Sequence, residues 1–218
     1  PMQVYNTLQV PEEKAILMGI KHLIIGGGAI DDALANELKD FPNQVWSTYG
    51  MTETLSHIAL RRLNGTDASD WYTPFDNVRI RLSEEGTLII HAPNVCAEEL
   101  ITNDIAEINE EGKFRILGRK DNTINSGGVK IQIEQVEATL KAHLDIPFQI
   151  TARKDAKFGE IVVLIYNKVG NEDDIRRVCE SELPTYWVPK AYIVVDELPM
   201  TGTGKPDRAS ARRIANGE

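Results

Sequence analysis

A segment near the start of the chain constrains the fold more than any other part. The apolar run Lys21-His-Leu-Ile-Ile25 predicts a buried strand, and glycines 26–28 follow it as a tight turn. Residues 31–40 begin with acidic side chains and carry two leucines four apart, a pattern typical of a helix. Residues 44–48 form a second apolar run. A strand, a helix and another strand in this order predict an α/β fold with parallel strands.

The pattern changes after Asn77, where short apolar runs alternate with turns such as Glu84-Glu85-Gly86. This alternation predicts an antiparallel meander. Its four strands are expected at residues 78–82, 87–90, 105–108 and 114–117. The polar connection Gly118-Arg-Lys-Asp121 follows them. We expect a domain boundary there, with domains at residues 1–118 and 119–218.

The second predicted domain is a small α+β unit. A hairpin is expected around Gly127 and Gly128, and residues 133–143 form an amphipathic helix with Val136 and Leu140 on one face. Asn171 is the expected N-cap of a further helix. The remaining predicted elements are strands at 148–152, 161–167 and 191–195, a helix over 171–183 and a short terminal helix; in the first domain, residues 12–19 also look helical.

Composition and charge narrow the classes of function. The chain has 218 residues, of which 42% are hydrophobic and 26% are charged, and this composition predicts a globular protein. Its net charge of −9 predicts that it binds neither nucleic acid nor membrane surfaces. The longest apolar runs are too short for a membrane span, and no leader pattern opens the sequence. Cys96 and Cys179 are far apart and lack metal-ligand spacing, which favours free thiols and a cytoplasmic location, with one disulfide as the alternative. The oligomeric state is not readable from these features.

One lysine stands in a loop suited to anion binding. Lys205 lies within Pro199-Met-Thr-Gly-Thr-Gly-Lys-Pro-Asp-Arg208, after the strand expected at 191–195. Glycines on both sides of a threonine let the backbone bend sharply and approach a ligand. The lysine adds a mobile positive charge that suits a phosphate or carboxylate.

Three other segments have both a binding and a purely structural interpretation. In Tyr49-Gly-Met-Thr-Glu53, the hydroxyl and the carboxylate suit phosphate and Mg²⁺, whereas the structural alternative makes Thr52 a helix N-cap. The run Gly26-Gly-Gly-Ala29 could cradle a nucleotide or form a plain turn, and its spacing is that of neither a Walker loop nor a dinucleotide fingerprint. Asp104 could pair with ribose hydroxyls or be a turn residue.

The order and spacing of these motifs resemble the adenylate-forming superfamily of acyl- and aryl-CoA synthetases, luciferases and peptide-synthetase adenylation domains. The segments that carry the resemblance are 26–29, 49–53, Asp104, 118–121, 126–128 and 199–208, in family order along nearly the whole chain. Residues 47–57 and 118–131 are most similar to the subfamily of o-succinylbenzoate–CoA ligases of menaquinone biosynthesis. The resemblance implies the C-terminal part of the large AMP-binding domain, followed by a small mobile C-terminal domain.

The resemblance also implies an activity. ATP and a carboxylate would give an acyl-adenylate and pyrophosphate, and coenzyme A would then give the thioester and AMP. In the first step Lys205 would bridge the carboxylate and the α-phosphate, Glu53 would hold Mg²⁺ and Thr52 would contact phosphate. Asp104 would pair with the ribose hydroxyls, with Arg119 beside it.

Further roles follow from the same resemblance. Gly27, Gly28, Ala29 and Tyr49 would bind ATP or AMP by framing the adenine and part of the acyl pocket, and Gly50 would be a further ATP- or AMP-binding position. Asp121 would be the hinge of the small domain, and Gly127 and Gly128 would let coenzyme A pass close to the backbone. Ser56 and His57 are acyl-pocket candidates by position.

The chain departs from the family pattern in two ways. It has Thr102-Asn-Asp104 where the family often has Thr-Gly-Asp, which leaves the backbone geometry of Asn103 open. The family's phosphate-gripping Ser/Thr/Gly-rich loop ending in lysine is not in this sequence, so we expect the C-terminal portion of a longer enzyme, inactive when isolated. The alternatives are another aryl- or fatty-acyl-CoA ligase, an adenylation domain, and a non-catalytic nucleotide-binding module.

Overall fold

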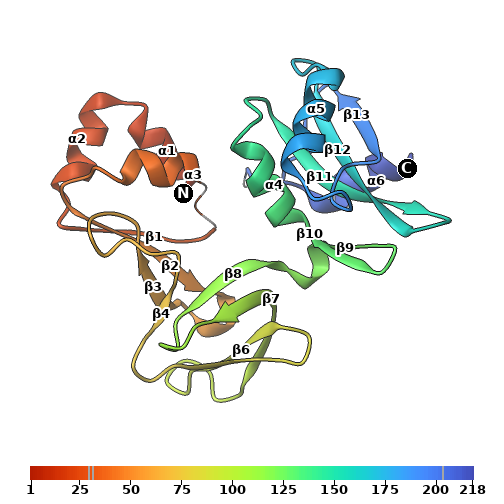
Figure 1. Cartoon of the computed structure of the whole chain (residues 1–218). Helices are drawn as coiled ribbons and strands as arrows, with labels where there is room; N and C mark the ends of the chain where they lie inside the picture. The colour runs from red at the N-terminus through yellow and green to blue at the C-terminus, as the bar shows by residue number, and fades with distance from the viewer. Residues whose placement is uncertain (29, 31, 203) are drawn as a thin grey trace. The chain divides into compact units, whose positions relative to one another are not determined.

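The computed structural model describes residues 1–28, 30, 32–202 and 204–218. The chain divides into two compact units, Pro1–Ile116 and Leu117–Glu218, two residues before the expected boundary (Figure 1). Each unit is described by itself below.

The first unit opens with the predicted strand–helix–strand segment. Its elements are α1 (Met2–Leu8), α2 (Pro11–Gly19), β1 (His22–Ile25), α3 (Asp32–Leu38), β2 (Gln44–Gly50), the 3-10 turn η1 (Thr52–Thr54), β3 (His57–Arg62) and β4 (Thr73–Pro74). Strands β1 and β2 pair in parallel, which confirms the α/β prediction, and the sheet order is β1-β2-β3-β4. Strand β3 was not predicted; it pairs antiparallel with β2 around an irregularity at Tyr49 and Gly50.

A small core holds this first sheet against its helices. Leu34 and Leu38 of α3 are buried with Ile25 and Val45 of the two parallel strands, so the leucine spacing seen in the sequence does mark the inner face. Helix α1, which was not predicted, buries only Leu8 in this core.

The antiparallel meander forms the second sheet of the same unit. Its strands are β5 (Arg79–Leu82), β6 (Thr87–His91), β7 (Leu100–Ile108) and β8 (Phe114–Arg119), in the order β5-β6-β7-β8, as predicted. Strand β7 begins five residues before the expected start and therefore includes Asp104. A second core joins this sheet to β3 through residues such as Ile58, Leu88 and Phe114.

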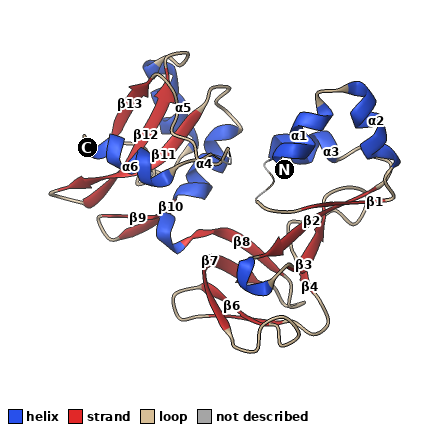
Figure 2. Ribbon diagram, turned by 180° about the vertical axis from the view of Figure 1, so that it is seen from behind, coloured by secondary structure: helices blue, strands red, loops and turns tan. Residues whose placement is uncertain are grey.

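The second unit is a mixed sheet with helices on both faces (Figure 2). Its elements are η2 (Lys120–Asn122), β9 (Thr123–Ser126), β10 (Val129–Gln132), α4 (Ile133–Lys141), β11 (Phe148–Asp155), β12 (Gly159–Asn167), α5 (Glu172–Glu182), β13 (Ala191–Val195) and α6 (Arg208–Asn216). One face of β11 and β12 packs against α4 and α5, and the other face of β12 packs against α6. Strand β13 pairs in parallel with β12.

Several local predictions hold in this unit. Residues 123–126 and 129–132 form the hairpin around Gly127 and Gly128. Val136 and Leu140 are fully buried on α4. The side chain of Asn171 caps α5 by accepting the backbone N–H of Asp173 at 2.9 Å. The small α+β unit is therefore confirmed from its local signals upward.

Among the described residues, no helix combines the length and apolar character that crossing a membrane requires. Cys96 is half-buried, Cys179 is buried, and both thiols are free.

Candidate functional site

The glycine turn lies at the carboxyl end of β1, beside the end of β2. A Cβ on Gly26 would stand 2.6 Å from Oγ1 of Thr48, so this glycine lets the turn pack directly on β2. Gly27 has φ +85°, a conformation that glycine adopts without strain, and Gly28 is exposed. Ala29, also predicted to bind nucleotide, is outside the described residues. The carboxyl ends of parallel strands are where open α/β sheets bind ligands.

Gly50 is needed for packing within the protein itself. A Cβ at this position would lie 2.2 Å from the carbonyl oxygen of Ser56 and 2.7 Å from Cα of His57. The close approach that a glycine permits is therefore made by the chain's own backbone, where β2 turns into β3. Gly50 shapes the segment that presents Thr52 and Glu53.

The turn η1 presents its two predicted ligands to solvent. Thr52 and Glu53 are exposed, whereas Thr54 is buried. The hydroxyl of Thr54 accepts the backbone N–H of Met51 at 3.0 Å and donates to the carbonyl of Ser56 at 2.7 Å. The N-cap of this turn is thus Met51, to which the Thr54 side chain bonds back, and the structural alternative that made Thr52 an N-cap is wrong. The hydroxyl of Thr52 is left at the surface, where a ligand could reach it.

Leu55 is a residue that the sequence did not single out. Its φ is 59°, in the left-handed region, and its side chain is 80% exposed. A leucine in this conformation is uncommon, and such backbone strain is often found at functional sites. The adjacent pair Ser56 and His57 is also exposed, with Oγ of Ser56 3.0 Å from Nδ1 of His57. No motif rule flags a left-handed leucine.

Tyr49 and Asp104 meet across the two sheets of the first unit. The hydroxyl of Tyr49 donates to Oδ2 of Asp104 at 2.5 Å, although the two residues are 55 positions apart. The Tyr49 ring packs edge-on against Phe114, with 5.1 Å between centroids. The backbone N–H of Asp104 also donates to Oγ1 of the buried Thr102 at 3.1 Å. The half-buried Asp104 carboxylate is therefore held in place by its own strand and by β2, and the alternative that made Asp104 a turn residue is wrong.

The predicted magnesium ligand is a single exposed carboxylate. Across the described residues, no three His, Cys, Asp or Glu side chains gather closely enough to form a metal cage. Mg²⁺ is commonly held by one or two carboxylates together with waters and substrate phosphates. An exposed Glu53 beside the hydroxyl of Thr52 fits a shared site of that kind.

The predicted hinge segment carries its own ion pair. Arg119 donates from Nη2 to Oδ2 of Asp121 at 3.0 Å, and both side chains are about half exposed. Just beyond them, the side-chain amide of Asn122 donates to Oε1 of Glu134 at 2.5 Å. The structure thus groups Arg119 with Asp121 in the second unit, and Asp104 belongs to the first.

The Gly127–Gly128 turn has an aromatic and basic neighbourhood that the sequence did not reveal. The backbone N–H of Gly127 donates to the carbonyl of Phe158 at 2.8 Å, and a Cβ on Gly127 would lie 3.3 Å from the Phe158 ring. Nζ of Lys190 lies 3.5 Å from the centroid of the same ring, and Nζ of Lys157 lies 5.1 Å from it. Only the long-range pairing of the sheet brings these residues together.

The Lys205 loop is a closed, hydrogen-bonded hairpin. The backbone N–H of Thr201 donates to the carbonyl of Lys205 at 2.7 Å, and the N–H of Lys205 donates to Oγ1 of Thr201 at 3.1 Å. At the base of the loop, the N–H of Asp207 donates to the carbonyl of Pro199 at 3.0 Å. Lys205 itself is exposed. Thr203, within the same motif, lies outside the described residues.

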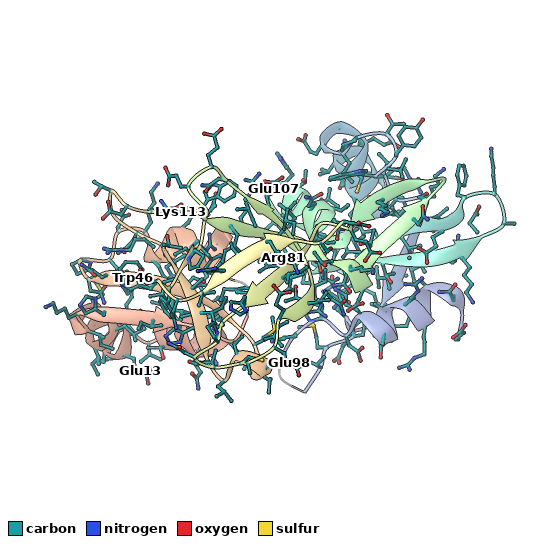
Figure 3. All side chains as sticks on the ribbon, turned by 90° about the horizontal axis from the view of Figure 1, so that it is seen from below. Glu13, Trp46, Arg81, Glu98, Glu107 and Lys113 are labelled. Carbon is teal, nitrogen blue, oxygen red and sulfur yellow. The ribbon has the colours of Figure 1, made fainter. Side chains whose placement is uncertain are left out.

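A hollow of the first unit lies away from the described site residues that the sequence predicted. Its volume is about 790 Å³, and Trp46 and Lys113, both labelled in Figure 3, contribute to its wall. The guanidinium of Arg62, another lining residue, stacks 5.1 Å from the centroid of the Trp46 ring. None of the described motif residues lines it.

The structure therefore brings together two groups of predicted residues. Gly26, Tyr49 and Asp104 gather around the end of β2 in the first unit. Arg119, Asp121, the Gly127–Gly128 turn and Lys205 all lie in the second unit.

Comparison with known proteins gives this arrangement a class. The model of the AMP-binding enzyme C-terminal domain matches residues 134–205. A crystal structure of an acyl-CoA synthetase (AMP-forming)/AMP-acid ligase II-like protein from Dyadobacter fermentans is 32% identical and covers 96% of this chain and 62% of that one, with a TM-score of 0.55. The chain is similar to adenylate-forming enzymes over nearly all of its length, and residues 134–205 match the C-terminal domain of AMP-binding enzymes.

Several named relatives to which the chain is similar share one name. A 2-succinylbenzoate–CoA ligase from Bacillus cereus is 28% identical over 89% of this chain and 47% of the relative. The o-succinylbenzoate CoA synthetase of Bacillus subtilis, solved with its acyl-adenylate intermediate, has the same fold: its TM-score is 0.74 at 23% identity, over 88% of this chain and 46% of that one. The chain spans about half the length of the curated relatives it matches.

Proposed function

We propose that this chain forms part of an ATP-dependent carboxylate–CoA ligase that converts o-succinylbenzoate to its CoA thioester in menaquinone biosynthesis. The observation that carries the proposal is the exposed Lys205 on a closed, hydrogen-bonded loop. The names of the curated relatives support the choice of acid. The same Bacillus subtilis synthetase has also been solved with ATP and a magnesium ion, which supports the choice of nucleotide and metal.

In the first half-reaction an oxygen of the acid attacks the α-phosphorus of ATP, and the bond to pyrophosphate breaks. Negative charge gathers on the phosphoryl oxygens as this happens. The ammonium group of Lys205 offsets that charge, which is electrostatic stabilisation of the transition state. A group held in place before the reaction stabilises charge without a reorganisation cost, so the hydrogen bonds of Thr201 to Lys205 matter as much as the lysine.

Residues of the first unit would hold the nucleotide. The carboxylate of Asp104, fixed by Tyr49, pairs with the two ribose hydroxyls. The backbone of Gly27 and Gly28 lies along the adenine. Arg119 is a further nucleotide-binding residue. The hydroxyl of Thr52 contacts phosphate. Glu53 would hold Mg²⁺, which when bound neutralises phosphate charge.

In the second half-reaction the sulfur of coenzyme A attacks the carbonyl carbon of the adenylate, and AMP leaves. The Gly127–Gly128 turn lets the thiol substrate approach the backbone closely. The ring of Phe158 and the ammonium of Lys190 add an apolar surface and a positive charge next to that turn. Asp121 is the hinge about which the second unit turns between the two half-reactions. Ser56 and His57 contribute to the acyl pocket.

The proposal is tested by Lys205→Ala, made both in this chain and in a protein of the relatives' length that contains it. In the longer protein, adenylate formation, measured as ATP–pyrophosphate exchange, should fall by about 100-fold or more, in line with the loss of one transition-state donor. Thioester formation from supplied acyl-adenylate should largely survive. If neither half-reaction changes, the assignment of Lys205 is wrong.

Lys168→Ala is the matched control, because Lys168 is an exposed lysine of the same unit that pairs with Asp196. It should change neither half-reaction. A panel of carboxylates, read as pyrophosphate release, tests the acid, and a preference for a fatty acid would replace o-succinylbenzoate in the proposal. Since the curated relatives are about twice as long, this chain by itself should form no adenylate, and detection of adenylate would contradict that expectation.

A further inference from the structure

The loop that carries Lys205 is tied to the body of the second unit at both of its ends. At the first end, Gln149 of β11, which is only 2% exposed, donates from Nε2 to the carbonyl of Pro199 at 2.8 Å. At the second end, the guanidinium of Arg208 makes two hydrogen bonds with the carboxylate of Glu137. Nη1 donates to Oε1 at 2.6 Å, and Nη2 donates to Oε2 at 2.7 Å.

Glu137 is itself anchored in the interior. It lies on α4 and is 7% exposed, and its Oε1 also accepts the backbone N–H of Ile150 on β11 at 2.9 Å. Nη1 of Arg208 reaches the carbonyl of the same Ile150 at 3.3 Å. One carboxylate therefore joins three elements: the helix α4, the edge strand β11 and the first residue of α6. All of these belong to the second unit.

A buried ion pair of this kind fixes the relative position of the elements it joins more than it adds to the free energy of unfolding. Desolvation of the two charges offsets most of their attraction, and apolar residues of similar volume are often as stable. What the pair offers is a fixed distance and angle, because two parallel bonds from a planar guanidinium allow little rotation. Burial acts to lower the pKa of Arg208, but the hydrogen bonds and charge of Glu137 outweigh it and raise that pKa, so the guanidinium keeps its charge.

The connection from this pair to the lysine is short and stiff. Pro206 and Asp207 stand between Lys205 and Arg208. The proline ring fixes one backbone angle, and Asp207 caps α6 by accepting the backbone N–H of Ser210 at 3.0 Å. A displacement of Arg208 would therefore be passed on to Lys205 with little loss.

We propose that Glu137 and Arg208 are positioning residues, which hold the Lys205 loop in one place for the adenylation step, with Gln149 fixing its other end. The inference rests on the proposed function, because it gives the lysine a task that requires precision. Neither residue touches the reacting atoms. Loss of the ion pair should slow adenylate formation, which uses Lys205, and leave the rate of thioester formation unchanged.

The first experiment measures how firmly the Lys205 loop is anchored, and it does not depend on activity. Arg208→Lys keeps the charge and removes the fork, and Glu137→Gln keeps an acceptor for the N–H of Ile150. Amide hydrogen exchange at Gly204 and Lys205 should become about tenfold faster in both variants, relative to amides of the central strand β12. Arg213→Lys, the same change on the exposed side of α6, is the matched control and should leave the loop unchanged. Equal exchange rates in the variants and the control would contradict the inference that Glu137 and Arg208 anchor the Lys205 loop.

The kinetic consequence is measured in the longer protein. Arg208→Lys should lower kcat for adenylate formation about tenfold, leave the KM for ATP within about twofold and preserve thioester formation from supplied adenylate. An equal loss in both half-reactions would show a merely structural role and overturn the proposal. The proposal would also be overturned if Arg208→Lys kept full adenylation activity while Lys205→Ala was inactive. If Lys205→Ala retains adenylation, the proposed function is wrong. The hydrogen-exchange data would still show, independently, whether the pair of Glu137 and Arg208 anchors the loop.

Discussion

Replacement of Gly50 by alanine tests how tightly the turn after β2 is packed. The added Cβ would lie 2.2 Å from the carbonyl oxygen of Ser56, where ordinary contacts are 3.4–4 Å, so backbone atoms must move by more than 1 Å. The backbone at Gly50 is outside the left-handed region, and the cost therefore comes from the contact. Overpacking costs about 1–3 kcal/mol, and the displaced Ser56 carbonyl also loses its hydrogen bond from Thr54, worth about 1 kcal/mol. We expect Gly50→Ala to destabilise the first unit by about 3 kcal/mol.

The assay follows the first unit by its own tryptophans. Trp46 and Trp71 belong to it, and a Trp187→Phe background removes the signal of the second unit. In urea, the loss should move the unfolding midpoint down by more than about 1 M. Gly19→Ala is the control, since a Cβ at that helical position would meet no described atom within 4 Å. If Gly50→Ala is no more destabilising than Gly19→Ala, the close-approach argument is refuted.

Three further predictions concern the second unit and the thiols. Asn171→Ala should lower the free energy of unfolding by about 1 kcal/mol, because α5 loses its cap; an unchanged denaturation midpoint would contradict this. Burial raises the pKa of the Cys179 thiol, so a maleimide should label Cys96 in the folded chain and reach Cys179 only after denaturation; mass spectrometry of the peptides would show equal labelling if this is wrong. Hydrogen bonds from Ser210, first from its backbone N–H and then from its hydroxyl, lower the pKa of Asp207. The stability that Asp207 contributes is therefore present above its ordinary pKa near 3.8 and lost as the pH falls through the lowered value. Asp207→Asn should melt earlier than the wild type at pH 7, with a gap that closes in acid, and a gap independent of pH would refute the linkage.

Local signals predicted much of the fold. The leucines of α3, the inner face of α4 and the Asn171 cap depend on residues a few positions apart, and each one lies where its spacing indicated. Strand β3 was missed because its run, His57 to Arg62, ends in two arginines and has no clear alternation. It is a strand because β2 offers it a partner, which a local pattern does not record.

The candidate site was less predictable than the fold for the same reason. Motif order gave the identities of Tyr49, Asp104 and Lys205, but the bond between Tyr49 and Asp104 joins residues 55 positions apart. The pair of Glu137 and Arg208 spans 71 positions. Neither partner carries a local signal of the other. Even a contact within one turn can be hard to predict. Whether the hydroxyl of Thr52 or of Thr54 bonds to the backbone depends on the path of that turn.

The parallel pairing of β12 with β13 has a consequence for the order in which the second unit assembles. Strands β11 and β12 are adjacent in sequence and can pair as soon as both exist, whereas β13 must wait for the crossover through α5. The segment from Pro199 to Arg208 follows β13, and it closes only when α6 docks on β12. We therefore expect the lysine loop to be completed late in folding and to be among the first parts lost on unfolding. A mildly destabilised protein would therefore lose the proposed chemistry while most of its sheet remained folded.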